Sequence, residues 1–263
     1  MIRRYEWSAF RSNEFREADP ERTIAVLPTA AIEQHGPHLP VGTDMYIAQG
    51  MLDELCRQCP DDVDIRILPV QSIGKSNEHI HACGTLSLTA QTALAAWIDI
   101  GHSIARAGLR KVVIVNSHGG NLSTIDILVR ELRVRFEMFA VKCQWGSFGY
   151  PDGLFSEQEK IYGIHGGDFE TSLMLAFQPH TVDMMSARDF RSSAETAAIA
   201  PTGSISYGWV ASDLGPDGVV GEAHLATAEK GRAVCSHQVA GFVDLLRKVR
   251  DENPSWQSPG SRM

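Results

Sequence analysis

A carboxylate, two imidazoles and a second carboxylate fall within the twelve residues from Glu33 to Asp44. In an extended backbone, residues i and i+2 point to the same side, so Glu33 and His35 can approach one ion together. The glycines and prolines that follow can turn the chain so that Asp44 returns to the same ion. Oxygen and imidazole donors without thiolate suit zinc, manganese or a similar divalent ion. The run predicts part of a metal site, with a polar surface loop as the alternative.

A second candidate, His118, follows the apolar, β-branched run 111–116 and precedes Gly119 and Gly120. Such a run is typical of a strand buried on both faces. Loops at the carboxyl ends of strands build the sites of open α/β sheets, and glycine lets the backbone come close to a ligand. His118 is therefore a candidate ligand, and a structural histidine at a strand end is the alternative.

A third segment runs from His165 through two glycines to Glu170 and then into the apolar stretch 173–177. This order predicts a glycine loop that enters a helix and ends near Pro179. An acidic residue in a first helical turn is favoured by the helix dipole, so Glu170 alone could be a helix-start charge. Together with His165 it becomes a candidate ligand or catalytic group.

These three segments, in this order and spacing, resemble the creatininase (creatinine amidohydrolase) family of metal-dependent amidohydrolases. The resemblance runs from about residue 7 to about residue 248 and implies a creatininase-like α/β fold. It also implies a pair of divalent ions bridged by Asp44. One ion would be held by Glu33, Asp44 and His118, and the other by His35, Asp44 and Glu170. His165 would be the catalytic histidine.

The charge of this ligand set agrees with two ions. Five protein ligands exceed the three that a single catalytic zinc usually takes. Three carboxylates against two divalent ions leave about one positive charge, which a hydroxide would neutralise. The expected reaction is hydrolysis by a metal-activated hydroxide, with His165 moving a proton to the departing group. Zinc and manganese are the expected ions, and iron is also compatible with these donors.

One departure from creatininase itself bears on the substrate. That enzyme has a tyrosine and a glutamate after the strand-end histidine, where this sequence has Gly119 and Gly120. The difference speaks against creatinine. The main hypothesis is cleavage of a C–N amide or formamide bond in a small substrate, either cyclic or open-chain. One alternative is ring opening of a cyclic sugar ketone or lactone. Another is a non-catalytic metal-binding protein on the same fold.

Substrate contacts are expected from Gly119, Gly120, Glu78 and His79, although the last two could equally be solvated loop residues. The glycine-rich stretch 204–222 can cover a site or pack a subunit contact. We expect Trp145 and Phe148 to pack in the core and not to line the pocket. The cysteines are odd in number and lack a paired zinc-ribbon spacing, so they are expected to be free structural thiols. The five cysteines are Cys56, Cys59, Cys83, Cys143 and Cys235.

The elements that position these side chains alternate along the chain. Strands are expected at 23–27, 65–70, 112–116 and 139–143, and helices at 44–57, 89–106, 123–136 and 226–250. This alternation predicts an α/β fold of three layers, α/β/α, around a mostly parallel sheet. Residues 1–252 are expected to form a single hydrolase domain, and residues 253–263 a flexible tail.

Charge and hydropathy bound the partners. A net charge of −8 and a pI of about 5.7 argue against nucleic acid. No window is apolar enough to span a bilayer, and the first residues lack a signal-peptide core, so a cytoplasmic protein without membrane contact is expected. The expected partner is a small-molecule substrate. The resemblance further implies a homo-oligomer, since members of this family commonly form hexamers.

Overall fold

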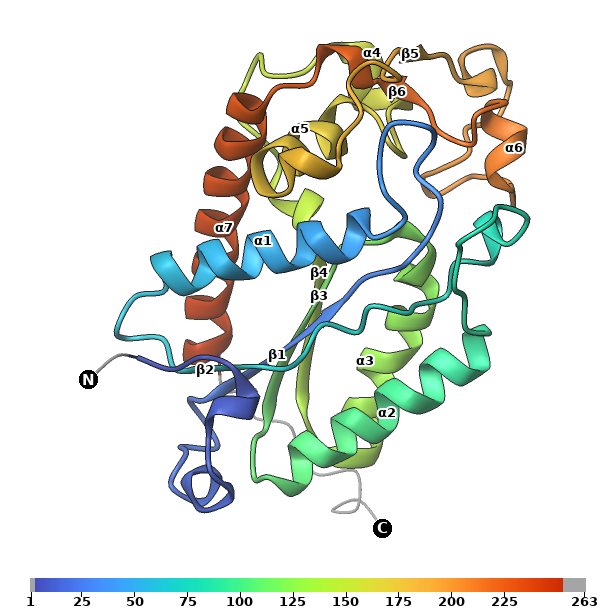
Figure 1. Cartoon of the computed structure of the whole chain (residues 1–263). Coiled ribbons are helices and arrows are strands. Elements are labelled where there is room, and N and C mark those ends of the chain that lie inside the picture. The colour runs from blue at the N-terminus through green and yellow to red at the C-terminus, as the bar shows by residue number, and fades with distance from the viewer. Residues whose placement is uncertain (1–2, 253–263) are drawn as a thin grey trace.

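The computed structural model describes residues 3–252, and its centre is a four-stranded parallel sheet (Figure 1). The strand order is β2-β1-β3-β4. The strand β2 is shorter than predicted because Pro69 has no N–H to give to a ladder. The bounds are Ile24–Thr29 for β1, Ile65–Ile67 for β2, Lys111–Asn116 for β3 and Phe139–Gln144 for β4.

Helices cover both faces of the sheet, which confirms the predicted α/β/α arrangement (Figure 1). Alternate residues of β1 point to opposite faces: Ile24 and Val26 enter one core, and Ala25 and Leu27 enter the other. The first core is closed by α1 (Thr43–Gln58), α5 (Asp168–Phe177) and α7 (Ala228–Asp251), and the second by α2 (Ala90–Arg106) and α3 (Leu122–Phe136).

A smaller group of elements lies beyond the carboxyl ends of the strands, at the top of Figure 1. It contains α4 (Glu157–Tyr162), the antiparallel pair β5 (Asp189–Phe190) and β6 (Gly221–Glu222), and α6 (Ala211–Leu214). The sequence predicted none of these, because strands of two residues and helices of four and six residues are too short to show a periodic pattern.

Polar side chains lock the ends of β1 and β3 together. The Oδ1 of Asn116 accepts hydrogen bonds from Thr29 Oγ1 at 2.9 Å and from Asn121 Nδ2 at 3.2 Å. Asn121 also donates to the carbonyl of Ala30 at 3.0 Å, and Asn116 Nδ2 donates to the carbonyl of His118. Because all of these groups are buried, the hydrogen bonds fix the loops that leave both strands.

The helix α5 is held against α7 by a close backbone approach at Gly231. A Cβ at this position would lie 1.9 Å from the backbone oxygen of Ser172, which cannot move aside as a side chain can. We expect Gly231→Ala to lower the free energy of unfolding by about 1–3 kcal/mol, measured by urea denaturation. The control is Gly146→Ala, where an added Cβ meets nothing within 4 Å. Equal stability of the two variants would contradict this reading of the contact.

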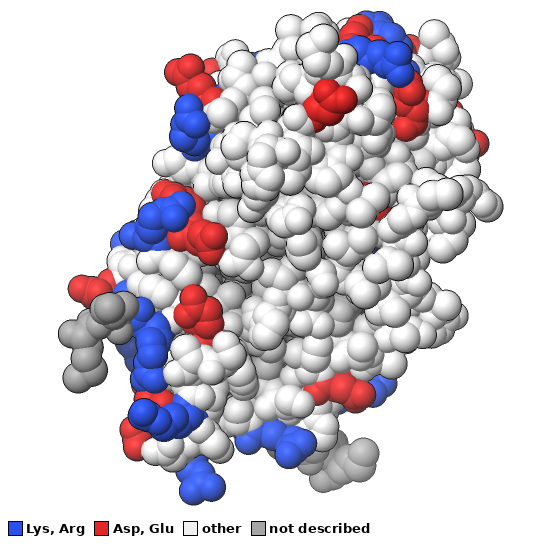
Figure 2. Space-filling view, in the orientation of Figure 1, with Lys and Arg blue, Asp and Glu red and all other residues white. Residues whose placement is uncertain are grey.

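Figure 2 shows lysine and arginine mixed with aspartate and glutamate around the rim of one face, with few charges across its middle. This face presents no continuous basic patch, and the absence of a nucleic-acid partner stays a prediction. Within residues 3–252, no helix is both long enough and apolar enough to cross a bilayer. All five cysteines are free thiols, as predicted.

Candidate metal centre

The predicted ligands come together at the carboxyl ends of β1 and β3. Glu33 and His35 follow β1, His118 follows β3, and Asp44 and Glu170 lie in the first turns of α1 and α5. Glu33, His35 and Asp44 are each only 1% exposed, and His118 is 5% exposed. Buried charges need paired partners or a metal, so this cluster is the strongest candidate for chemistry among the described residues.

The orientation of His35 is fixed by the backbone. Its Nδ1–H donates to the carbonyl of Glu33 at 3.0 Å. Its other ring nitrogen, Nε2, therefore faces two carboxylates, with Asp44 Oδ1 at 3.4 Å and Glu170 Oε2 at 3.7 Å. Within residues 3–252, Nε2 of His35 and Oδ2 of Asp44 are buried atoms without a hydrogen-bond partner. Orphaned donor atoms of this kind fit a metal ion.

His118 faces the same carboxylates from the other side. Its Nδ1 lies 3.2 Å from Glu33 Oε1 and 3.3 Å from Asp44 Oδ2. Its Nε2–H donates to the carbonyl of Lys75 at 3.0 Å. This bond puts the proton on Nε2 and leaves Nδ1 as the ligating nitrogen.

The possible ligand atoms form three overlapping groups, within each of which the atoms lie within 4.8 Å of one another. The groups are Glu33 with His35 and Asp44, Glu33 with His79 and His165, and His35 with His165 and Glu170. These groups contain four of the five predicted ligands and add His79 and His165. The fifth, His118, is in none of the groups but lies 3.2 Å from Glu33 and 3.3 Å from Asp44. His79 is 3% exposed, and its Nε2 lies 3.5 Å from Glu33 Oε1, so it is a buried member of the cluster rather than a solvated loop residue.

The predicted catalytic histidine, His165, lies between His35 and His79, with ring centroids 4.2 Å and 4.3 Å away. Its Nε2–H donates to the carbonyl of Gln34 at 2.8 Å, so its free nitrogen, Nδ1, points toward Glu33 Oε1 at 3.6 Å. Burial lowers the pKa of His165 well below its usual value, and the neighbouring His35 lowers it further. The imidazole of His165 is therefore neutral at neutral pH, and its Nδ1 carries a lone pair.

Gln34, which the sequence analysis left without a role, contacts two of these imidazoles: His165 through its carbonyl oxygen and His79 through its side chain. Its Nε2 donates to Gly218 O at 2.6 Å and to His79 Nδ1 at 2.9 Å, and its Oε1 accepts from the N–H of Gly36. With Nδ1 as acceptor, the proton of His79 lies on Nε2, toward Glu33. The only signal in the sequence was the place of Gln34 between Glu33 and His35.

The protonation of this cluster makes metal uptake sensitive to pH. Burial would lower the pKa of His35, but Asp44, Glu170 and Glu33 raise it to about 9. Burial likewise opposes protonation of His118, whose pKa Glu33 and Asp44 nevertheless raise well above the usual value. Burial raises the pKa of Glu170 to about 7.

Because ligands must be deprotonated, we expect zinc binding at pH 7 to release about two to three protons per chain, one each from His35 and His118 and a fraction from Glu170. The number released should fall as the pH rises through about 9, where His35 loses its proton without metal. Calorimetric titration of metal-free protein with zinc, in buffers of different ionisation enthalpy, measures this number. Binding without proton release would show that the ion does not displace the protons of these imidazoles.

A cavity of about 490 Å³ opens onto Glu33, His118 and His165. Glu78, His79, Gly119 and Gly120 also line it, as expected for substrate contacts, whose role stays a prediction. Its outer wall is the segment 201–209, which includes Tyr207 and Trp209. Part of the glycine-rich stretch thus lines the cavity, and its role as a cover or as a subunit contact stays a prediction. Trp145 is instead 3% exposed and packs with Phe148 against Phe242, away from the cavity.

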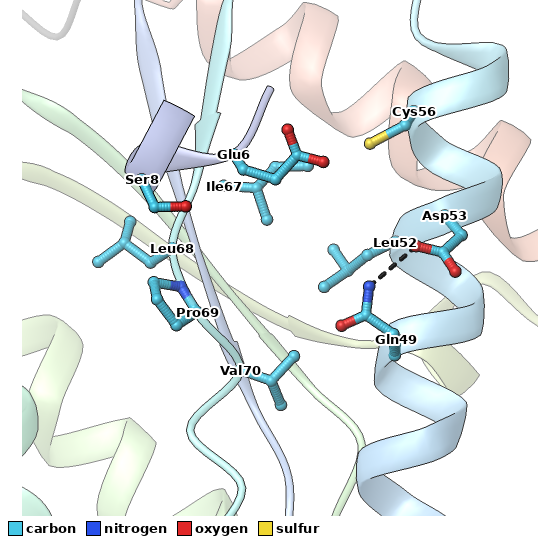
Figure 3. Close-up of a pocket in the computed structure, with 10 residues that line it drawn as sticks. All are labelled: Glu6, Ser8, Gln49, Leu52, Asp53, Cys56, Ile67, Leu68, Pro69 and Val70. Carbon is cyan, nitrogen blue, oxygen red and sulfur yellow. Dashed lines mark hydrogen bonds between the residues drawn. The ribbon is translucent and has the colours of Figure 1, made fainter. Parts of the chain in front are cut away.

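A smaller cavity of about 170 Å³ lies between α1 and the stretch Ile67–Val70 (Figure 3). Its one thiol, that of Cys56, has a pKa raised to about 11 by burial, so the thiol is unreactive at neutral pH. Its acid Asp53 accepts a hydrogen bond from Gln49 at 2.9 Å. This second cavity contributes no group to the cluster.

A parallel α/β sheet with buried imidazoles and carboxylates at the carboxyl ends of its strands defines an α/β protein with a candidate metal centre. The creatininase family, described as creatinine amidohydrolase, matches residues 8–246. The mycofactocin precursor peptide peptidase of Mycobacterium ulcerans is 31% identical, with 85% of this chain and 84% of that protein covered. The creatinine amidohydrolase of Pseudomonas putida is 29% identical, covering 86% and 89%. The chain belongs to the creatininase family and is an enzyme.

Solved structures agree on the fold. A manganese creatininase superimposes with a TM-score of 0.74 at 24% identity, covering 95% of this chain and 100% of that one. A creatininase variant of Zn-Zn type gives the same values. The predicted family and the predicted α/β fold are therefore confirmed.

Proposed function

We propose that this enzyme is a dinuclear metal hydrolase that cleaves a C–N amide or formamide bond of a small substrate. The observation that carries the proposal is the position of Asp44, with one oxygen 3.4 Å from His35 Nε2 and the other 3.3 Å from His118 Nδ1. A carboxylate that faces both imidazoles can bridge two ions. Glu33 would complete the ligands on the His118 side, and Glu170 those on the His35 side.

The donor set supports zinc or manganese, with iron as a third option. The similar folds of a manganese creatininase and of a Zn-Zn creatininase variant support the same ions. Two divalent ions held here would act as Lewis acids on the scissile carbonyl and make water a nucleophile near neutral pH.

The side chains supply the proton transfers. His165 presents Nδ1 beside Glu33, takes a proton from the attacking water and returns it to the departing nitrogen. The carbonyl of Gln34 keeps the other ring nitrogen protonated throughout. Tyr207 and Trp209 limit the access of bulk water to the cavity.

The names of two relatives support amide chemistry, since a peptidase and a creatinine amidohydrolase both hydrolyse C–N bonds. A cavity of about 490 Å³ suits a small molecule or a few residues of a peptide. Homo-oligomerisation, a cytoplasmic location and the absence of nucleic-acid or membrane partners remain predictions of the sequence.

The test is elemental analysis of the purified protein, followed by a substrate screen with zinc or manganese supplied. We expect close to two ions per chain, and release of amine, ammonia or formate from an amide, formamide or peptide. Activity should disappear on chelation and return with metal. Full activity in the chelated protein would refute metal dependence, and ring opening of a cyclic ketone without loss of nitrogen would favour the alternative reaction.

A further inference from the structure

We propose that the segment Lys75–His79, called here the 75–79 loop, controls the affinity of one metal position and not of the other. The position concerned is that of Glu33 and His118, and Glu78 acts on it as a positioning residue for His118. The inference rests on the proposed dinuclear site and adds an asymmetry between its two halves.

The first observation is the surroundings of the non-ligating nitrogen of His118. Its Nε2 lies 3.0 Å from the carbonyl oxygen of Lys75 and 3.5 Å from Glu78 Oε1. Both groups are acceptors and favour a proton on Nε2, which keeps the lone pair on Nδ1. A carboxylate beside the outer nitrogen of a ligating histidine also makes the ligand more basic.

Glu78 is itself held in place. Its second oxygen, Oε2, pairs with Lys75 Nζ at 2.7 Å, and its side chain is only 10% exposed. The ammonium group thus holds the carboxylate in place, with its other oxygen, Oε1, 3.5 Å from His118 Nε2. Lys75 therefore contributes twice, by its carbonyl to His118 and by its side chain to Glu78.

The same loop also holds the other ligand on this side. Ser76 Oγ donates to Glu33 Oε2, and His79 Nε2 lies 3.5 Å from Glu33 Oε1. The ligands of the second position are held from elsewhere. His35 donates to the backbone carbonyl of Glu33, and Glu170 accepts from the N–H of Gly166 at 2.6 Å. The outer support of the two positions thus comes from different parts of the chain.

Gly120 makes room for this arrangement. A Cβ at residue 120 would lie 1.9 Å from Glu78 Oε1, 2.4 Å from His118 Nε2 and 2.7 Å from the backbone oxygen of Lys75. A Cβ at Gly119 would meet nothing within 4 Å. Of the two adjacent glycines, only Gly120 is required by the contact between Glu78 and His118.

The test is competition titration of zinc against a chromophoric chelator, which resolves two affinities per chain in the wild type. In Glu78→Gln we expect one affinity to weaken by about 10- to 100-fold and the other to stay unchanged. The matched control is Glu157→Gln, which removes the carboxylate of the Glu157–Lys160 surface pair, also three residues apart and 2.7 Å long. Two unchanged affinities in Glu78→Gln, or an equal loss at both positions, would overturn the inference.

A second pair of variants separates positioning from loss of the fold. Gly120→Ala should reproduce the selective loss of one affinity, and Gly119→Ala should retain both. Thermal unfolding of the metal-free variants reports whether the fold survives, and Glu78→Gln carries the test if Gly120→Ala does not fold. If the wild type itself binds no metal, the proposed dinuclear site fails. If the wild type binds two ions and all variants match it, only the present inference fails.

Discussion

Replacing Asp44 with asparagine is expected to remove both metal ions and to lower kcat/KM by more than about 100-fold, beyond the loss found for outer partners of metal ligands. The side chain keeps its size but loses its charge. One of the two positions, beside His35 or beside His118, would then face an amide N–H in place of an oxygen. Metal content per chain and the rate with a substrate from the screen measure the effect.

The control for this variant is Asp53→Asn, on the same helix α1 but exposed and bonded to Gln49. It should keep both ions and full turnover. Retention of two ions by Asp44→Asn would contradict the bridging role. Loss of only one ion would show that Asp44 serves a single position.

His165→Ala is expected to keep both ions while kcat falls by about 10²- to 10⁴-fold, the range for a general acid–base group. The reason is that Nδ1 of His165 is near Glu33 but not within the shortest contacts of the cluster. Rates as a function of pH should also lose the limb that reports the titration of this imidazole. The measurements are kcat, its pH profile and metal content on the same preparation.

Metal content decides between two roles for His165, because its imidazole also belongs to two of the three groups of possible ligand atoms. If His165→Ala loses an ion, the imidazole is a ligand and the acid–base assignment is wrong. The control is His237→Ala, an exposed histidine on α7 whose Nε2 is bonded to the carbonyl of Phe148. It should change neither metal content nor rate.

The sequence predicted the central fold because its elements follow simple periodicity. The run 111–116 is buried over its full length, and the alternation of strands and helices led to the observed three layers. The meeting of Glu33 with His118 was implied only by the family resemblance. In the structure they lie 3.2 Å apart because each follows a strand of the same parallel sheet, and parallel strands end at one edge.

The contacts that could not be predicted join segments distant along the chain. Gln34 bonds to His79 and Gly218, and Glu78 reaches His118 across 40 positions. No periodic pattern records which loop folds over which strand end. The spacing of residues also gave no reason to distinguish Gly119 from Gly120, because the difference depends on where the carboxylate of Glu78 lies.

The cavity is lined by two parts of the chain, one that carries the candidate ligands and one that carries none. Every predicted ligand lies between residues 33 and 170, either in a loop that follows β1 or β3 or in the first turn of α1 or α5. The outer wall at 201–209 contributes none of them, although it shapes the entrance beside His79. Insertions or substitutions in this wall can therefore change the shape of the cavity, and with it the substrate that fits, without moving a metal ligand. One hydrolytic chemistry can in this way diverge toward different substrates through a short surface stretch.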